Sequence, residues 1–179
     1  IVDFNNHTYF FQRGHEPLLY TDESGSGVLE AMSDHSHSTG TAPQGNEVLA
    51  AFGKLWVADV TGNKHTVYWS DTLNGHAWTG GASGSLDLTN VFPSGNDEIV
   101  ALSAFNNFLV IFCKRSIIIY SGADNTTTTD FKLHDTVEGV GCVARDSVQH
   151  TGTDIIFLSE DGVRSFSRTI QEKSMPMRD

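Results

Sequence analysis

The chain has 179 residues, of which 39% are apolar and 18% charged, a balance typical of ordinary globular proteins and not of disordered segments. The 22 acidic and 11 basic side chains give a formal net charge of −11. Such a surface disfavours a protein that must grip a phosphate backbone, although it does not exclude a surface past which DNA slides.

A pattern of short strands and tight turns recurs along the chain about every fifty residues. Taking Phe4, Phe52, Phe105 and Thr151 as equivalent positions gives spacings of 48, 53 and 46 residues. Each repeat has a short strand, a turn, a strongly apolar strand, a second turn and another apolar strand. The first turns are predicted at Asn5-Asn6, Gly53-Lys54, Asn106-Asn107 and Gly152-Thr153, and a further hairpin turn at Asp161-Gly162.

The predicted strands follow in the same order in every repeat. The middle strands are TYFF (8–11), LWVA (55–58), FLVIF (108–112) and IIFL (155–158). The third strands are PLLY (17–20), VYW (67–69), IIIY (117–120) and VRSF (163–166). Fourth, outer strands are expected in polar intervals such as SLDLTNVF (85–92) and DFKLHDTV (130–137). Residues 21–47, which are rich in Ser, Gly and acidic side chains, are predicted to be a loop insertion.

The most apolar stretch, residues 104–124, could be taken for a membrane anchor. Its apolar run, Phe108 to Tyr120, has only 13 residues, whereas a spanning helix needs about 20 apolar residues. Lys114 and Arg115 also lie at its centre, where charge is most costly in a bilayer. Two strands joined by a turn at Lys114-Arg115 explain the pattern better.

Three strands per repeat at this period are typical of a β-propeller, or part of one, with about four antiparallel blades of roughly fifty residues. The inner strands of a blade are covered on both sides, so they lose alternation and become continuous apolar runs. A β-sandwich is the rival all-β fold. The chain begins with Ile rather than Met and is expected to be a single propeller-type segment, 1–179, of a longer protein.

His35 and His37, together with Asp34, are the first candidate metal ligands. Their alternating spacing on a Ser/Gly-rich segment gives no preorganised geometry, and no further strong ligand follows nearby in the sequence. We therefore expect a solvated histidine pair there and predict no metal site. Cys113 and Cys142 have no metal-ligand or disulfide spacing and are expected to be reduced thiols buried in strands.

The segment SDTLNGHAW (70–78) resembles the Asp-box of sialidase-like propellers. In that motif an aspartate binds local backbone amides and a tryptophan packs beneath the turn. We accordingly assign Asp71, Gly75 and Trp78 to turn architecture. A glycosidase would also need paired carboxylates, and a sialidase an arginine cluster and a tyrosine nucleophile, which no part of the sequence presents as a recognisable set.

Arg145-Asp146, in GCVARDSV, is expected to be a local ion pair or turn ligand. The glycine-rich strings GSGVLE and GVGCVA lack the spacing of a phosphate-binding loop, and no nucleophile elbow or zinc-type His-Glu motif occurs. The sequence therefore predicts no catalytic or cofactor-binding residue and no enzyme.

Several strings, in this order, resemble the tail tubular protein B or nozzle family of short-tailed bacteriophages. They are VYWSD (67–71), GASGSLDL (81–88), DEIVAL (97–102), SIIIYSGAD (116–124), GVGCVARDSV (139–148) and GVRSFSRTIQEKSMPMRD (162–179). The resemblance covers about residues 48–179 and is weaker over 1–47. Members of the family are several times longer, so the chain would correspond to the propeller-bearing segment.

The resemblance implies a non-enzymatic structural virion protein in the phage tail. Such proteins form a ring, typically of six copies, below the adaptor that joins the tail to the portal. They help to hold the tail fibres and control the conduit through which the genome leaves, so DNA passes transiently without being bound specifically. The implied partners are further copies of the chain, the tail adaptor and the tail fibres.

Two alternatives follow from the residues themselves. A glycan-binding or sialidase-like propeller that adheres to the host surface is favoured by the Asp-box-like segment 70–78. Within the nozzle interpretation, residues 21–47 could supply the contact between subunits or with a fibre.

Overall fold

The computed structural model describes residues 1–22, 25–92, 95–125 and 130–174, which form four antiparallel sheets and one short α-helix. The first sheet contains β1 (Val2–Phe4), β2 (His7–Gln12), β3 (His15–Thr21) and β4 (Val28–Ala31). The second contains β5 (Gly45–Ala51), β6 (Lys54–Val60), β7 (Thr66–Trp69) and β8 (Gly84–Asp87).

The third sheet contains β9 (Ile99–Phe105), β10 (Phe108–Cys113), β11 (Ser116–Ser121) and β12 (Lys132–Glu138). The fourth contains β13 (Gln149–His150), β14 (Ile155–Ser159) and β15 (Gly162–Ser165), and α1 (Phe166–Ser174) follows it. The short 3₁₀ turns η1 (Met32–Asp34) and η3 (Arg145–Ser147) lie between sheets. The predicted all-β class with antiparallel sheets is confirmed.

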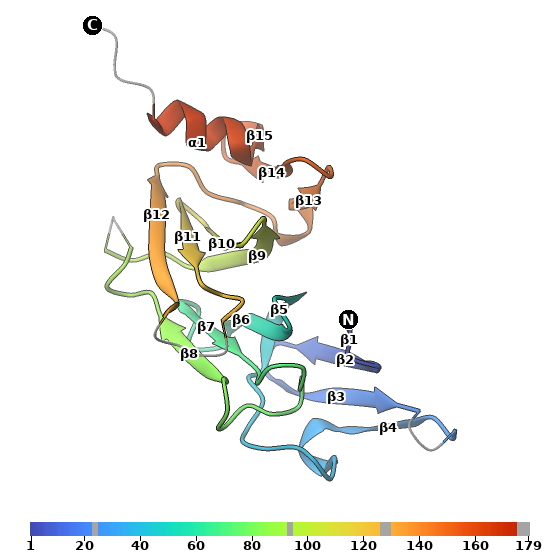
Figure 1. Ribbon diagram of the computed structural model, residues 1–179. Coiled ribbons are helices and arrows are strands. Elements are labelled where there is room, and N and C mark those ends of the chain that lie inside the picture. Colours follow the sequence, from blue (N-terminus) through green and yellow to red (C-terminus); the bar gives the residue numbers. More distant parts are fainter. Residues whose placement is uncertain (23–24, 93–94, 126–129, 175–179) are drawn as a thin grey trace, which may run out of the picture.

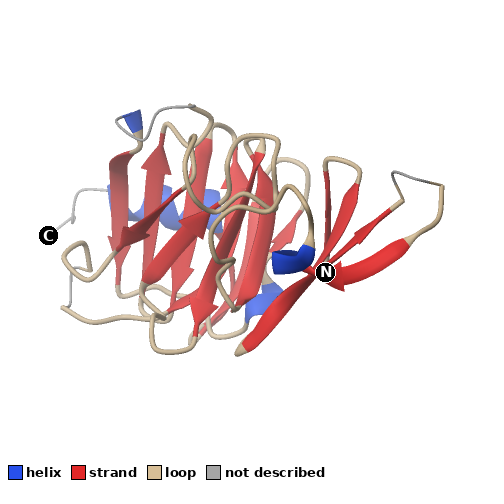
Figure 2. Cartoon of the chain, turned by 90° about the horizontal axis from the view of Figure 1, so that it is seen from below, coloured by secondary structure: helices blue, strands red, loops and turns tan. Residues whose placement is uncertain are grey.

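Strands lie in chain order within every sheet, and the sheets follow one another along an arc (Figure 1). The first strands β1, β5, β9 and β13 lie on the concave side of this arc, and β4, β8 and β12 lie on its convex side. Strand β5 contacts β1, β2 and β9, so the concave strands of the first three sheets adjoin. Seen from below, the sheets form successive layers (Figure 2).

The core consists of three apolar clusters, one in each gap between neighbouring sheets. Tyr9, Leu19, Met32 and Leu55 lie between the first and second sheets. Trp56, Trp69, Leu88, Leu109, Ile111 and Ile118 are among those between the second and third. Val110, Phe112, Ile117, Ile155, Phe157 and Phe166 are among those between the third and fourth.

Strand β10 shows why its sequence is apolar without alternation. Leu109 and Ile111 point into the cluster shared with the second sheet, whereas Val110 and Phe112 point into the cluster shared with the fourth. Since successive side chains of a strand point to opposite faces, a strand covered on both faces must be apolar at every position. The predicted apolar hairpin of β10 and β11, with its turn at Lys114-Arg115, is confirmed.

The predicted turns agree with the structure at Asn5-Asn6, Asn106-Asn107 and Gly152-Thr153, and the other two lie within one residue. Strands β5 and β6 are joined through Phe52 and Gly53, both with positive φ, and not through Gly53-Lys54. Strands β14 and β15 are joined through 160–161, so that Gly162 opens β15. The outer strands expected within 85–92 and 130–137 correspond to β8 and β12, and β8 is shorter than predicted because it ends at Asp87.

The segment 21–47 is not simply a loop insertion. Apart from 23–24, which lie outside the described residues, it contains β4 and η1, and β5 begins within it. Strand β4 pairs with β3 through Leu29↔Tyr20 and its neighbours, completing the first sheet. The sequence signal is weak because β4 is short and its apolar side chains Val28 and Leu29 are exposed.

Helix α1 was not expected, and the predicted strand VRSF ends at Ser165 because Phe166 opens the helix. Ser165 caps the helix by accepting the Arg168 N–H (3.2 Å), and Asp154 accepts the Ser167 N–H (3.0 Å). Phe166 packs on Phe112 and Phe105. Of the helices within the described residues, none is long and apolar enough to cross a membrane.

Replacing Phe112 by Ala is expected to lower the free energy of unfolding by about 3–5 kcal/mol, because the fully buried ring fills the gap between the third and fourth sheets. Urea unfolding would measure the loss. The matched control is Leu133→Ala on β12, which is 48% exposed and is expected to change stability by no more than roughly 0.5 kcal/mol. Equal losses in the two variants would contradict the stacked-sheet core.

Candidate functional site

Three histidines from distant parts of the sequence form a cluster between the first and second sheets. His7 opens β2, His35 directly follows η1, and His76 lies in the connection between β7 and β8. One ring nitrogen of each lies within 4.8 Å of a ring nitrogen of the other two. All three side chains are buried, with residue exposures of 7%, 9% and 8%. We call these three residues the histidine cluster.

Each ring of the cluster is held by a neighbour at Nδ1. The His7 Nδ1 lies 2.8 Å from the backbone oxygen of Asn5, and the His35 Nδ1 lies 2.8 Å from Glu30 Oε1. Carbonyl and carboxylate oxygens can only accept hydrogen bonds, so both Nδ1 atoms carry a proton. The His76 Nδ1 contacts the Tyr9 hydroxyl at 3.3 Å. With a proton on Nδ1, the second ring nitrogen of His7 and His35, Nε2, is the one that can bind a metal ion.

Main-chain hydrogen bonds bring His35 and His76 together. Thr39 and Ala77 form a parallel bridge, in which the Thr39 N–H donates to the His76 oxygen (3.2 Å) and the Trp78 N–H donates to the Thr39 oxygen (2.7 Å). The Ser38 hydroxyl donates to the same His76 oxygen (3.0 Å). The segment after η1 is thus attached directly to the connection that carries His76.

That connection is the Asp-box-like turn, and its predicted architectural role is seen in its hydrogen bonds. Asp71 Oδ1 accepts the backbone N–H groups of Thr72 (2.8 Å) and Ala82 (2.7 Å), closing the loop between β7 and β8. Trp78 packs against Phe11 of the first sheet and donates to the Met32 sulfur (3.3 Å). The turn is therefore both a local structure and part of the interface between the first two sheets.

Gly75 belongs to the same turn because nothing larger fits there. A Cβ at this position would lie 2.6 Å from the Tyr9 ring and 2.7 Å from Leu55 Cδ1. The absence of a side chain lets the turn press against the core and places the adjacent His76 beside Tyr9.

The candidate ligands Asp34, His35 and His37 differ in their exposure to solvent. His35 is buried, whereas Asp34 and His37 are exposed. The expectation of a solvated pair therefore fails for His35 and agrees with the exposure of His37. The spacing of residues in the sequence could not predict that His7 and His76 lie near His35. Both approach His35 only because one sheet packs on the next.

Glu47 on β5 is a buried carboxyl that the sequence analysis did not single out. Its Oε1 accepts the backbone N–H of Leu102 on β9 (2.7 Å), and its Oε2 lies 3.8 Å from Arg145 Nε. Burial raises the pKa of Glu47 to about 7, although the Leu102 hydrogen bond and the Arg145 charge both act to lower it. The only sequence signal is an acidic residue at the start of the apolar run VLAA.

Arg145 and Asp146 form the expected local ion pair, with Arg145 Nε 2.8 Å from Asp146 Oδ1. Arg145 also donates to the Asn46 backbone oxygen at 2.7 Å. This residue of η3 thereby reaches β5, and with Glu47 it connects the second sheet to the segment that precedes the fourth. The role is structural and extends further than the predicted local pair.

Both cysteines are buried and not bonded in a disulfide, as predicted. Cys113 lies in β10, and burial raises the pKa of its thiol far above the ordinary value. Cys142 lies outside any strand, contrary to expectation, and its N–H donates to the Cys113 oxygen (2.8 Å). Both thiols pack the core, and the raised pKa of Cys113 makes that thiol unsuited to nucleophilic chemistry.

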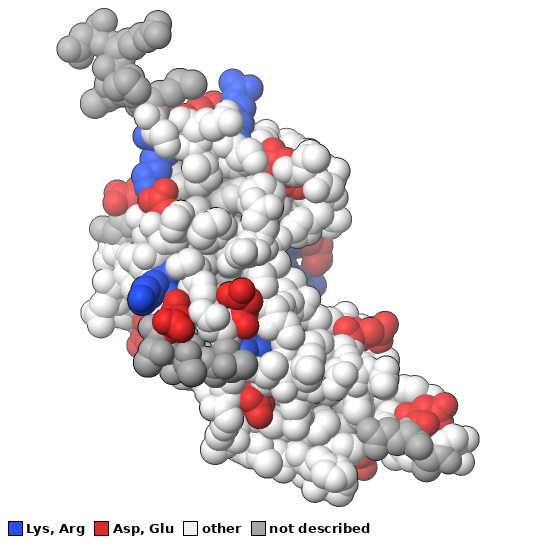
Figure 3. Space-filling model, viewed as in Figure 1, with Lys and Arg blue, Asp and Glu red and all other residues white. Residues whose placement is uncertain are grey.

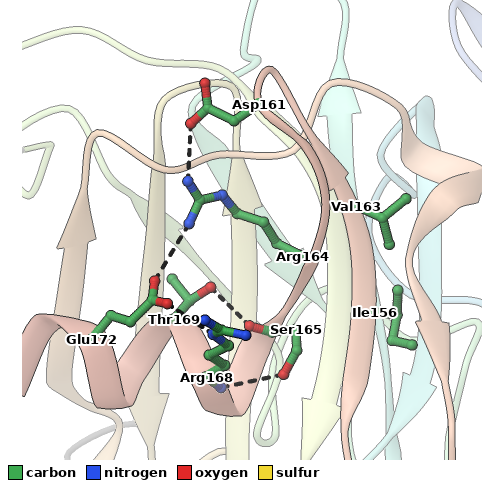
Figure 4. A pocket seen from close by; sticks show the side chains of 8 residues that line it. All are labelled: Ile156, Asp161, Val163, Arg164, Ser165, Arg168, Thr169 and Glu172. Carbon is green, nitrogen blue, oxygen red and sulfur yellow. Dashed lines mark hydrogen bonds and ion pairs between the residues drawn. The ribbon is translucent and has the colours of Figure 1, made fainter.

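A pocket of about 430 Å³ lies between the fourth sheet and α1 (Figure 4). Arg164 reaches both Asp161 (2.9 Å) and Glu172 (3.6 Å), and Arg168 contacts the same Glu172 (2.9 Å). Both carboxyl groups are thus paired with arginines, and Arg164 bridges them (Figure 4). Glycoside hydrolysis needs two carboxyls placed on either side of the bond to be cleaved.

Comparisons with known proteins assign no family, since no family model matches the chain and no curated protein matches it. Function must therefore be inferred from the fold, the residue blocks and the sites described above.

Replacing Asp71 by Ala is expected to lower the free energy of unfolding by about 1–3 kcal/mol, because two backbone N–H groups lose their acceptor. Asp71→Asn should lose less, since its amide oxygen can still accept. Thermal and urea unfolding would compare both with Asp87→Ala. Asp87 accepts from Thr89 in the same manner but is exposed, so its loss should be small. A loss at Asp87 as large as at Asp71 would refute this account.

Glu47 is expected to make stability fall as pH rises from about 4.5 to about 7, because the folded state holds its proton over this range and the unfolded state does not. Glu47→Gln cannot ionise and keeps an acceptor for the Leu102 N–H. The stability of Glu47→Gln relative to the unaltered chain should therefore rise by roughly 2–3 kcal/mol across that range.

Urea unfolding at a series of pH values would measure this difference. Glu138→Gln, at an exposed position of β12, is the control and should leave the pH dependence unchanged. Parallel pH profiles for Glu47→Gln and the unaltered chain would show that Glu47 does not titrate as its burial implies.

Proposed function

We propose that this chain is a structural, non-enzymatic module of a phage tail nozzle, located in the virion. In this proposal it is a β-propeller, or part of one, in the ring through which the genome is ejected. The observation that carries the proposal is the succession of four antiparallel sheets, each with its strands in chain order and each packed on the next. The residue blocks that resemble the nozzle family supply the biological context.

A propeller blade runs from an inner strand to an outer one, and its neighbours cover its two faces. The arc of sheets with β1, β5, β9 and β13 on the concave side supports this arrangement (Figure 1). The hydrogen bond from Leu102 to Glu47 also joins the first strands of the second and third sheets. Four meandering sheets on one arc favour a propeller over the rival sandwich, in which two sheets face each other.

The outer faces of the first and fourth sheets carry apolar side chains. Leu18, Tyr20 and Leu29 on the first sheet are 38%, 40% and 58% exposed, and Tyr20 and Leu29 are cross-strand partners. On the fourth sheet Ile156 and Val163 are 37% and 74% exposed. In the proposed ring, further sheets or neighbouring copies cover these faces. The contact role expected of 21–47 would then reside in β4.

Charge supports passage of DNA rather than retention. The chain carries a net charge of −11, and the face seen in Figure 3 has scattered charges without a continuous basic patch. Lys64 and Lys114 both pair with Glu98, and Arg13 pairs with Asp59. Cations that are already paired release few counterions from a phosphate backbone, so DNA would slide past such a surface.

Negative-stain electron microscopy of the product of the complete reading frame tests the proposal. We expect rings that join the tail adaptor and are incorporated into tail particles. A monodisperse monomer that never joins tail particles would contradict it.

A glycan array and a glycosidase assay on the 179-residue chain test the alternative of a sugar-binding propeller. The nozzle proposal predicts no specific sugar and no turnover. Specific binding that depends on the pocket of Arg164 and Arg168 would instead favour host-surface adhesion.

A further inference from the structure

We propose that His7, His35 and His76 bind one divalent transition-metal ion of the zinc type, which links the first sheet to the second. This inference does not depend on the nozzle proposal. It also goes beyond the structural role of the Asp-box-like turn. Asp71 closes that turn through backbone N–H groups, so the turn does not require the His76 side chain.

The spacing of the three rings fits a shared ion after small side-chain rotations. Zinc binds imidazole nitrogens at about 2.0–2.1 Å in tetrahedral geometry, which places ligand nitrogens roughly 3.4 Å apart. The cluster nitrogens lie within 4.8 Å of one another, and the ring centroids of His35 and His76 are 4.6 Å apart. Rotations that close these gaps by about 1 Å bring three imidazoles into one coordination sphere.

The groups behind the rings are those that support metal-bound histidines. Such histidines almost always donate their second ring N–H to a carboxylate or a backbone carbonyl, which fixes the tautomer and orients the ring. Glu30 plays this part for His35, and the Asn5 carbonyl plays it for His7. Because Nδ1 is engaged in both rings, Nε2 is the nitrogen that would bind the ion.

The donor set selects the kind of ion. Three imidazoles suit Zn²⁺ and, among its neighbours, Cu²⁺ and Ni²⁺, whereas Mg²⁺ and Ca²⁺ require oxygen ligands. Among the described residues, no carboxylate or thiolate joins this three-residue group, so a water molecule would complete a tetrahedron. His37 is exposed, and its ring contacts that of His35 at a centroid distance of 5.7 Å without belonging to the group.

The ligands come from elements that only the fold brings together. His7 belongs to the first sheet, His76 to a connection of the second, and His35 to the segment between the two sheets. An ion held by all three would tie these elements together as a cross-link. Its binding free energy would add to the stability of this interface, because the unfolded chain has no comparable site.

Isothermal titration of the metal-stripped 179-residue chain with Zn²⁺ tests the proposal, with Co²⁺ absorption as a second measurement. We expect one equivalent of Zn²⁺ to bind and to raise the Tm, and Co²⁺ to give the visible absorption of a tetrahedral site. His35→Ala and His76→Ala should weaken Zn²⁺ binding at least about 100-fold and abolish the rise in Tm. Glu30→Ala, which removes the acceptor that orients the His35 ring, should weaken it about 10–100-fold.

His37→Ala is the matched control, since it removes a neighbouring exposed histidine and should leave both affinity and absorption unchanged. Far-ultraviolet circular dichroism would establish that each variant is folded, and Glu30→Ala provides the test if a ligand variant does not fold. Failure of the chain to bind Zn²⁺ would overturn the proposal. Full-affinity binding by the folded ligand variants, or an equal loss in His37→Ala, would also overturn it.

Discussion

Burial of the middle sheets on both faces is the constraint on which the rest of the structure depends. Strand β10 directs Leu109 and Ile111 to one neighbour and Val110 and Phe112 to the other, so it can exist only between two sheets. The same requirement sets the order of the sheets and keeps Cys113 buried and unreactive. Polar side chains therefore lie mainly at the ends and edges of the stack, where turns and connections meet.

The polar contacts that do lie between sheets are specific ones. Glu47 connects β5 to β9, and Arg145 connects η3 to β5. The histidine cluster joins the first sheet to the second through β2, the segment after η1 and the connection between β7 and β8. Burying such groups costs free energy unless each finds a partner. At these positions, hydrogen bonds and ion pairs fix how neighbouring sheets are arranged, in addition to apolar packing.

The sequence predicted the strands well wherever burial produced a strong pattern, as in LWVA, FLVIF and IIIY. It missed β4 because only four residues form it and its apolar side chains face outward. It missed α1 although Ser165 is a good cap and Arg168 and Glu172 form an i,i+4 ion pair, since Val163–Phe166 also fits a strand. The histidine cluster was beyond prediction, because 28 and 41 residues separate its members and only packing between sheets joins them.

The central claim is that this stack of sheets is a propeller-type part of a ring. A cryo-electron microscopy map of the complete protein, at a resolution that traces strands, tests it most directly. The account predicts a ring in which β1, β5, β9 and β13 surround a propeller axis and further sheets or copies cover the faces that carry Leu29 and Val163. A monomer in which both faces remain in contact with solvent would contradict it.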